Sequence, residues 1–324
     1  MENLPPSSIS RLEISQPTFN LLLKGVDIAF KLSNKIDKSK VSNVIQSSES
    51  FPSLSDWVVA IRTNLEGLEY HVANITIALA VVHEKCRKDG DIPTAGTLPG
   101  DALEFVWNLI YVALTTELDG SPLNSFSQSS QGFLCVSLCH LKNGDDIEQL
   151  WRLHIWQPGG PRGNPDTPIH SHQAFAQSWI LAGKGRDDPY IVEPTSSAAA
   201  ATHAEYALAW SNDGKNFTTD YVANPKHSRL QRTEKLVTAT CPGSAFHTRD
   251  MTYAIPAGAY HTSNVEPQDF HATLFFFDAK RGFLKTAGVL GPTDGGPYYM
   301  QRDAGANTAA SLAREVQSAR LAGL

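Results

Sequence analysis

The order of hydrophobic and polar positions divides the chain into a helical part and a β-rich part. Between residues 17 and 120, apolar residues recur at spacings of three and four, which is typical of one face of an amphipathic helix. This spacing predicts helices over Phe19–Phe30, over Trp57–Tyr70 with a continuation through Ile75–Val82 to Cys86, and over Gly100–Thr116. A last amphipathic helix is predicted over residues 308–322.

From about Gly132 onward the pattern changes to short runs rich in β-branched and aromatic residues, separated by turns rich in Pro, Gly and Asn. The runs are Phe133–His140, Leu150–Trp156, Phe175–Leu181, Pro189–Val192, Ala204–Trp210, Lys235–Ala239, Thr248–Ile255 and His271–Phe277. Because no helix is predicted between them, they indicate an antiparallel barrel, either closed or built from two sheets. We therefore expect a mainly β fold, with a helical N-terminal region over residues 1–125, a β-barrel over 126–300, and a C-terminal helix over 301–324 packed on the barrel.

Composition narrows the class of protein. A hydrophobic fraction of 41% in 324 residues excludes a largely disordered chain, and a net charge of -6 argues against nonspecific nucleic-acid binding. The four cysteines show no C-x-x-C spacing, so we expect them to be reduced. The N-terminus lacks the pattern of a secretory signal, and the longest apolar run is too short to span a bilayer. We expect a cytoplasmic protein with no membrane or nucleic-acid partner, as a monomer or homodimer.

The histidines are distributed unevenly along the chain, which indicates that the functional site lies in the β-rich half. Nine of the eleven histidines lie after residue 125. His170 and His172 are two residues apart, so on a strand both imidazoles project from one face and can hold a single metal ion. A third candidate ligand, His261, follows a Pro-x-Gly turn. The long separation between His172 and His261 in the sequence suits two strands that meet across a closed barrel. The competing interpretation is a metal-free barrel in which these histidines are hydrogen-bonded.

Two motifs carry a resemblance to a known family. One is H-x-H…G and the other is P-x-G-x-x-H-x-x-N, formed here by His170, His172 and Gly183 and by Pro256, Gly258, His261 and Asn264. The pair resembles the two motifs of the cupin superfamily, and residues 130–280 are more narrowly similar to its thiol (cysteine) dioxygenase branch. The resemblance implies a jelly-roll, double-stranded β-barrel and an Fe(II) held by His170, His172 and His261. It also implies a dioxygenase that combines O2 with a small thiol or another chelating, anionic metabolite.

Several positions depart from the pattern of that branch. Gln177 stands where cysteine dioxygenases often have a cysteine that is cross-linked to a tyrosine, and Thr273-x-Phe275-x-Phe277 stands in place of Ser-x-His-x-Tyr. Asp250 occupies the position of the first glycine of the second motif. Neither the cross-link nor the hydroxyl relay can form, which argues against cysteine itself as the substrate.

The alternation of side chains between the two faces of a strand predicts the other site residues. Arg152 shares a face with His154 and Trp156, and its cation would suit a substrate carboxylate. Tyr253 is expected on one face with His247, Arg249 and Met251 of the strand that leads into the Pro-x-Gly turn. Gln177 would reach the metal only through a bulge, as a weak ligand or as a hydrogen-bond donor to bound oxygen. For Arg152 a structural salt bridge, and for His154 a hydrogen-bonded core histidine, are the alternatives.

Three functions remain open from the sequence. The first is the iron dioxygenase, with a small-molecule substrate and O2 as partners. The second is a non-redox cupin, an isomerase, lyase or hydrolase that uses Zn, Mn or Ni as a Lewis acid, and Cu is a further alternative metal. The third is a barrel that binds a ligand without turnover.

Overall fold

The computed structural model describes residues 4–30, 35–46, 53–88, 98–116, 124, 126–143, 146–219, 225–302 and 305–324. Its helices are α1 (Gln16–Ala29), α2 (Lys38–Gln46), α3 (Leu54–Asn64), α4 (Gly67–Lys88), α5 (Gly100–Thr115) and α6 (Ala309–Leu321). Its strands are β1 (Phe126–Gln128), β2 (Leu134–Asn143), β3 (Asp146–Trp156), β4 (Ala174–Thr195), β5 (His203–Ser211), β6 (His227–Thr240), β7 (Ala245–Thr248), β8 (Thr252–Ile255), β9 (Tyr260–Asn264), β10 (His271–Phe283), β11 (Val289–Gly291) and β12 (Tyr298–Gln301). The expected order of helices, strands and a final helix is confirmed.

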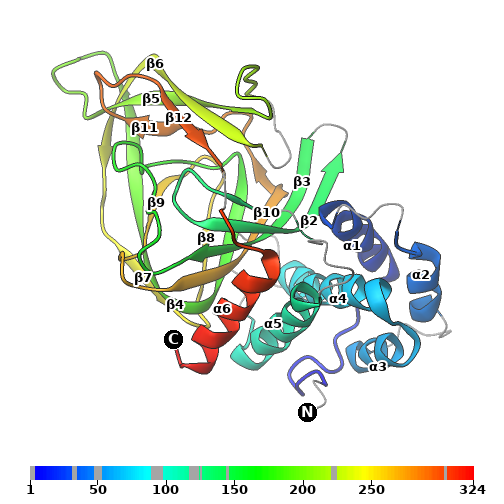
Figure 1. Ribbon diagram of the computed structural model, residues 1–324. Coiled ribbons are helices and arrows are strands. Elements are labelled where there is room, and N and C mark those ends of the chain that lie inside the picture. Colours follow the sequence, from blue (N-terminus) through cyan, green and yellow to red (C-terminus); the bar gives the residue numbers. More distant parts are fainter. Residues whose placement is uncertain are drawn as a thin grey trace.

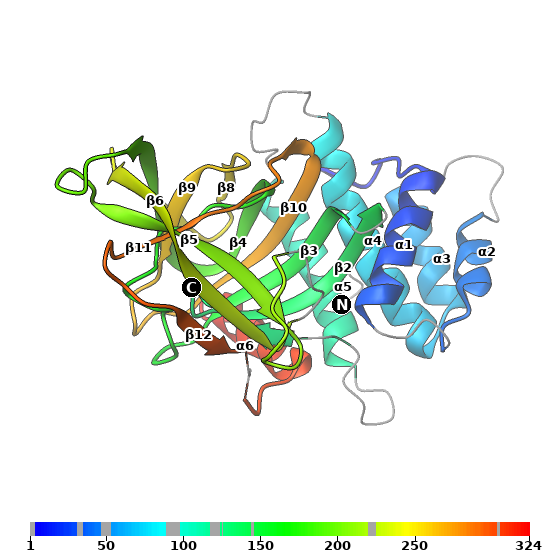
Figure 2. The same ribbon diagram turned by 90° about the horizontal axis from the view of Figure 1, so that it is seen from above.

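The strands form one antiparallel sheet in the order β1-β2-β3-β10-β4-β6-β5-β11, with β7, β8 and β9 paired to β4 and β12 paired to β6. The sheet is curled, and helices α1–α5 lie together on one side of it (Figures 1 and 2). The mainly β class is therefore correct, whereas the jelly-roll arrangement stays a prediction. Among the described residues, no helix is long and apolar enough to cross a membrane.

The two faces of the sheet have different roles, which strand β3 illustrates. Trp151, Leu153 and Ile155 are buried in the apolar core that faces the helices. Arg152 and His154, at the alternate positions, line a cavity on the inner face. Successive side chains of a strand point to opposite faces, so the residues of β3 that pack in the core lie on one face and the residues that line the cavity lie on the other.

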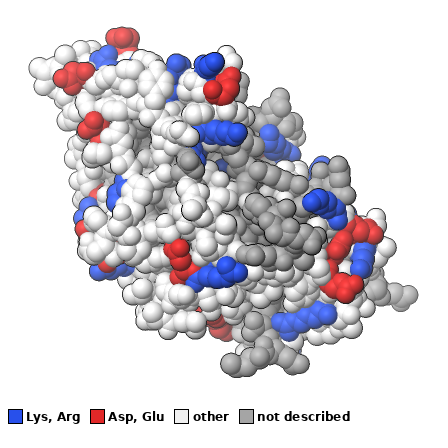
Figure 3. All heavy atoms as spheres, viewed as in Figure 1, with Lys and Arg blue, Asp and Glu red and all other residues white. Residues whose placement is uncertain are grey.

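One continuous core joins the helices to the outer face of the sheet. It contains Trp57 and Trp107 from the helices together with Trp151 and Phe276 from the sheet, and the last two stack at a centroid distance of 3.8 Å. Helix α6 is tied to this core by Arg320, whose guanidinium donates to the Leu181 carbonyl and to Glu104 of α5. On the face shown in Figure 3, charges of both signs are interspersed. Exposed ion pairs contribute little, so the stability of the fold comes mainly from the buried core.

Three predicted elements are divided differently in the structure. The helix expected from Trp57 to Cys86 is two helices, because Leu65 leaves the helical conformation and Gly67 adopts a positive φ of 55°. The two strands expected over Phe175–Leu181 and Pro189–Val192 are one long strand, β4. Helix α2 and strands β1, β11 and β12 are not predicted by the pattern of apolar and polar residues.

The strand expected over Thr248–Ile255 is also interrupted. Strand β7 ends at Thr248 and β8 begins at Thr252, with Asp250 between them at a left-handed φ of 68°. Arg249 points away to α6, where it donates to the Arg320 carbonyl at 2.7 Å. The expectation that His247, Arg249, Met251 and Tyr253 share one strand face is therefore wrong, because a turn resets the alternation.

Candidate metal centre

Three histidines that are distant in sequence converge at the inner face of the sheet. His170 and His172 lie in the segment between β3 and β4, and His261 lies on β9. One ring nitrogen from each lies within 4.8 Å of the others, and Nε2 of His172 is 3.1 Å from Nε2 of His261. The structure thus brings together the three residues predicted as metal ligands.

The local backbone differs from the regular strand expected at His170. His170 forms isolated bridges with His261 and Val289, while His172 lies outside any named strand and β4 begins only at Ala174. The backbone pairing of His170 with His261, through N–H···O bonds of 2.9 Å in both directions, brings the two motifs together. Gly258 adds a hydrogen bond from its N–H to the His172 carbonyl at 2.8 Å.

Asp187 of β4 orients the third histidine. Nδ1 of His261 donates to the Asp187 carboxylate at 2.7 Å, and both side chains are largely buried. This hydrogen bond occupies Nδ1 of His261, and Nε2 of the same ring faces Nε2 of His172 at 3.1 Å. A carboxylate behind a ligating histidine is a common outer partner in metal sites, where it raises the basicity of the ligand.

Burial keeps the other two imidazoles neutral. It lowers the pKa of His170 to about 3, assisted by His261, although a hydrogen bond from Nδ1 to the Pro168 carbonyl at 3.1 Å acts against the shift. Burial is the largest cause that holds the pKa of His172 well below its usual value, and the neighbouring His170 and His261 lower this pKa further. Neutral imidazoles have the protonation state that a metal requires of its ligands.

The donor set fits a divalent transition metal. The 3.1 Å separation of Nε2 of His261 and Nε2 of His172 can be bridged by a shared proton or by a bound cation, and three converging imidazoles supply the nitrogen ligands that Zn, Cu, Fe and Ni accept. The group contains no carboxylate ligand, so a bound M²⁺ would keep its full charge toward the cavity.

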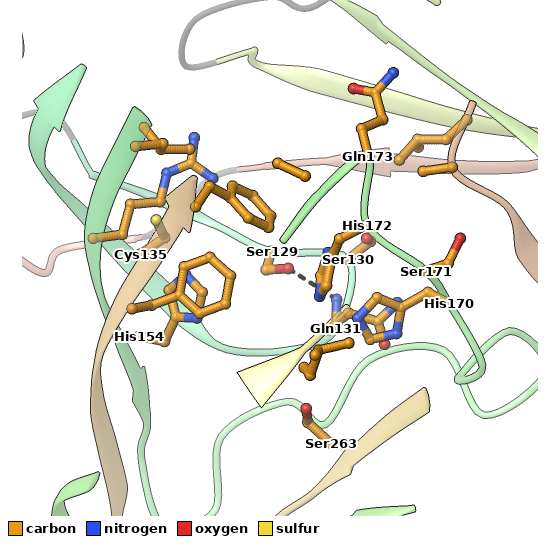
Figure 4. A pocket seen from close by; sticks show the side chains of 18 of the residues that line it. Ser129, Ser130, Gln131, Cys135, His154, His170, Ser171, His172, Gln173 and Ser263 are labelled. Carbon is orange, nitrogen blue, oxygen red and sulfur yellow. Dashed lines mark hydrogen bonds between the residues drawn. The ribbon is translucent and has the colours of Figure 1, made fainter. Parts of the chain in front are cut away.

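A cavity of about 210 Å³ opens beside the three histidines. Its described lining includes no Asp or Glu, but it does include Arg152 and Arg302. Figure 4 shows His170 and His172 at one side and Cys135 and His154 across from them. A small volume with this lining suits a small, negatively charged ligand.

Arg152 and His154 both line the cavity, as the alternation of β3 predicted. No hydrogen bond or ion pair joins the Arg152 guanidinium to another described residue, and its Nε is buried without a partner. A salt bridge at the rim is therefore not found for Arg152 within the described chain. The His154 ring is stacked between Phe133 and Phe275, with centroid distances of 4.0 and 4.3 Å.

Tyr253 reaches the cavity although its predicted strand is broken. It lines the inner face beside Ser178 and Ser263 and stacks on His247 at 4.2 Å. Burial raises the pKa of Tyr253 to about 12, and Asp187 adds to the shift. The phenol is therefore a protonated hydrogen-bonding group at neutral pH.

Gln177 does not reach the metal-binding group. Its amide accepts from Arg281 Nη1 at 3.0 Å and donates to Thr252 Oγ1 at 3.3 Å, and it is not among the residues that line the cavity. Strand β4 stays regular at this point, with Gln177 paired to Phe276 and Ala254, so no bulge turns the side chain inward. A metal-bound role for Gln177 is therefore wrong for this geometry.

Asp187 and Arg302 lie at the site although the sequence pattern did not predict them. Asp187 belongs to the run Arg186-Asp187-Asp188-Pro189, and two adjacent acids on a strand place one side chain on each face. This pair of adjacent acids was the feature of the sequence that could have predicted a carboxylate on the inner face of the sheet. Arg302 follows β12, and no periodic pattern marks it.

Comparison with known proteins gave structural matches only. No family model and no curated protein sequence matches the chain. A cupin-like protein from Thermotoga maritima is 12% identical over 51% of this chain and 84% of its own, with a TM-score of 0.26. An oxalate decarboxylase from Lactobacillus farciminis is 10% identical over 47% of this chain and 30% of its own, with a TM-score of 0.23.

A third match, a chain from crystal structures of DMSP lyases, is 12% identical over 72% of this chain and all of its own, with a TM-score of 0.33. This chain thus spans about a third of the oxalate decarboxylase. At these identities and scores, the matches carry no argument about activity. The case for a metal centre therefore rests on the three convergent histidines and the carboxylate behind His261.

Proposed function

We propose that this chain is a cupin-type metalloenzyme and, more narrowly, a mononuclear nonheme iron dioxygenase acting on a small anionic substrate. The observation that carries the proposal is the group formed by His170, His172 and His261, whose ring nitrogens converge beside a cavity. Fe(II) held by three imidazoles would supply open coordination positions for a chelating substrate and O2.

The chain's own residues would bind and shield the substrate. Arg152 offers a guanidinium with no acidic partner among the described residues, which favours a substrate carboxylate or other oxyanion. Phe275 and Phe277 wall the cavity beside His172, at ring centroid distances of 6.0 and 5.1 Å. These aromatic rings exclude water from the reacting groups. With a thiol substrate both oxygen atoms enter the product, RSH + O2 giving RSO2H, so no further reductant is needed.

The first test is the metal content of the protein purified without added metal. Wild-type protein is expected to carry close to one transition metal per chain, and His170→Ala to lose it while keeping its circular dichroism spectrum. His203→Ala is the matched control, because His203 on β5 contacts Thr202 and is not among the cavity-lining residues. Equal metal content in His170→Ala and wild type would contradict the ligand assignment.

The second test is O2 consumption after anaerobic Fe(II) reconstitution, against a panel of thiols and carboxylates. Uptake that depends on both iron and one member of the panel supports the dioxygenase. Protein that binds only zinc and consumes no O2 would refute the dioxygenase and leave a Lewis-acid cupin as the remaining metal-dependent function.

A further inference from the structure

Two arginines line the cavity beside the three histidines. They are Arg152 of β3 and Arg302, which follows β12. The described lining contains no Asp or Glu, and within the described chain the Arg152 guanidinium has no hydrogen bond or ion pair, although its Nε is buried. Two cations that share a small space repel each other, and they are costly to desolvate unless an anion joins them. The cavity therefore has the charge of an anion-binding site.

Strand pairing brings Arg302 to the same end of the cavity as Arg152. Nε of Arg302 donates to the Gln128 carbonyl at 2.8 Å, and the N–H of Gln128 donates to the Arg302 carbonyl at 3.4 Å. Gln128 belongs to β1, which pairs with β2 in the stretch that contains Cys135, and β2 in turn places Ser137 opposite Arg152. The hydrogen bond to Gln128 thus holds the Arg302 guanidinium at the edge of the sheet nearest to β3.

The thiol of Cys135 marks where the two charges lie. Burial raises the pKa of Cys135, and Arg152 and next Arg302 oppose this shift, so both guanidinium groups lie near that sulfur. Cys135 lies across the cavity from His170 and His172 (Figure 4). With a metal at the histidines, the cavity would therefore have two electropositive ends.

An aromatic wall separates these two ends. Phe275 of β10 is the register partner of Arg152, and its ring centroid lies 6.0 Å from that of His172. A ligand that extends from the arginines to the histidines passes this apolar surface. Its charged groups are therefore expected at its two ends, with a short carbon chain between them.

We propose that Arg152 and Arg302 together bind one doubly charged acidic group, a phosphate monoester or a pair of carboxylates, and that the substrate carries this group at the end away from the three histidines. The inference deepens the proposed function and rests on it only for the metal-binding end of the substrate. Planar guanidinium groups donate to two oxygens at once, so two of them match a group with several charged oxygens. One guanidinium already neutralises a monoanion, and the pair should therefore discriminate by charge.

The experiment compares anions of similar shape that differ by one charge. The first pair is methyl phosphate and methyl sulfate, because a phosphate monoester has a second pKa of about 6 and is mostly a dianion at about pH 7.5, whereas a sulfate monoester is a monoanion. The second pair is malonate and its monoamide, malonamate. Each anion is titrated by calorimetry into metal-free protein, in which the two arginines are the only Lys, Arg, Asp or Glu of the described cavity lining.

Wild type is expected to prefer the dianion of at least one pair by about 10-fold or more, the size of one hydrogen bond to a charged group. A preference in the first pair identifies a phosphate as the bound group, and a preference in the second identifies a dicarboxylate. Arg152→Gln and Arg302→Gln should each lower the ratio toward one. Arg302→Lys should retain most of it, because lysine keeps the positive charge.

The controls separate recognition from structure. Arg229→Gln is the matched control, because the guanidinium of Arg229 on β6 lies 4.7 Å above the Phe217 ring and does not line the cavity, so the ratio should not change. Urea unfolding checks that each variant is folded, and if Arg302→Gln is not, Arg152→Gln decides in its place.

A ratio near one for both pairs in wild type, no binding of either dianion, or an unchanged ratio in the folded glutamine variant would overturn the inference. Failure to bind a transition metal would instead count against the proposed function alone, because the anions are titrated without metal.

Discussion

Asp187→Asn tests the metal centre through a residue that does not touch the metal. The carboxylate accepts a 2.7 Å hydrogen bond from Nδ1 of His261, a length typical of charge-assisted pairs. Asparagine keeps an oxygen acceptor of the same size but removes the negative charge. The substitution therefore asks how much the charge behind His261 contributes to holding a metal in front of it.

The expected magnitude follows from this geometry. Outer partners of ligating histidines are worth about 10- to 100-fold in metal affinity, or about 1.4–2.8 kcal/mol. Because Asp187→Asn preserves an acceptor, it should fall near the lower end, at about tenfold, and Asp187→Ala should approach the upper end. His261 keeps its position on β9 in both variants, because its backbone is paired to His170 on one side and to Pro189 on the other.

The assay is competition for Zn²⁺ or Ni²⁺ with a chromophoric chelator at fixed pH. Asp188→Asn is the matched control, because Asp188 follows directly in sequence but accepts from Asn264 at 2.8 Å and from Arg186 instead of from a candidate ligand. Asp188→Asn should lower stability and leave the metal Kd of the folded protein unchanged. Equal Kd values for wild type and Asp187→Asn, or an equal change in both variants, would refute the role assigned to Asp187.

Two further predictions concern the fold. Burial lowers the pKa of His140 and of His271 to about 3, against ~6.5 for an unperturbed histidine, so the unfolded chain binds more protons between these values. The free energy of unfolding of metal-free protein should therefore fall from about pH 6.5 toward about pH 4, by up to ~1.4 kcal/mol per pH unit for each histidine; a urea midpoint that does not change with pH would contradict this. Gly183→Ala should destabilise by more than about 2 kcal/mol, because Gly183 has a φ of 76° and a Cβ there would lie 1.8 Å from the Phe270 carbonyl oxygen. Gly243→Ala, with nothing within 4 Å, should be close to neutral in the same urea titration.

The parts of the fold that the sequence predicted are those with a strong local period. Helices α1 and α5 and strand β3 each direct apolar residues into the main core, and these residues are visible in the sequence as a regular spacing. The prediction divided strand β4 at residues 182–188, a stretch that contains Gly183 and Gly185. In the structure they allow close approach of other chain segments, since a Cβ at Gly185 would lie 3.2 Å from the His271 ring.

Local turns between apparently alternating residues were the main source of error. The run from Thr248 to Ile255 alternates like one strand, but Asp250 adopts the left-handed conformation, which aspartate tolerates better than most residues. Tyr253 was therefore assigned to the inner face through an alternation that does not exist. It reaches the cavity because β8 pairs independently with β4, where Tyr253 is opposite Ser178.

In the candidate site, too, some residues can be predicted from a local pattern, whereas others depend on contacts between distant parts of the chain. Arg152 and His154 follow from the alternation of a single strand, and the three histidines follow from two recognisable motifs. Asp187 could not be assigned in this way, because its role depends on the register between β4 and β9, which places Pro189 opposite His261 and so brings Asp187 toward the ligand. In this chain, the residues proposed to contact a ligand or metal are predictable from one strand or motif, whereas the residue that orients His261 is determined by strand pairing, and for that reason Asp187 is the position where substitution tests the structure itself.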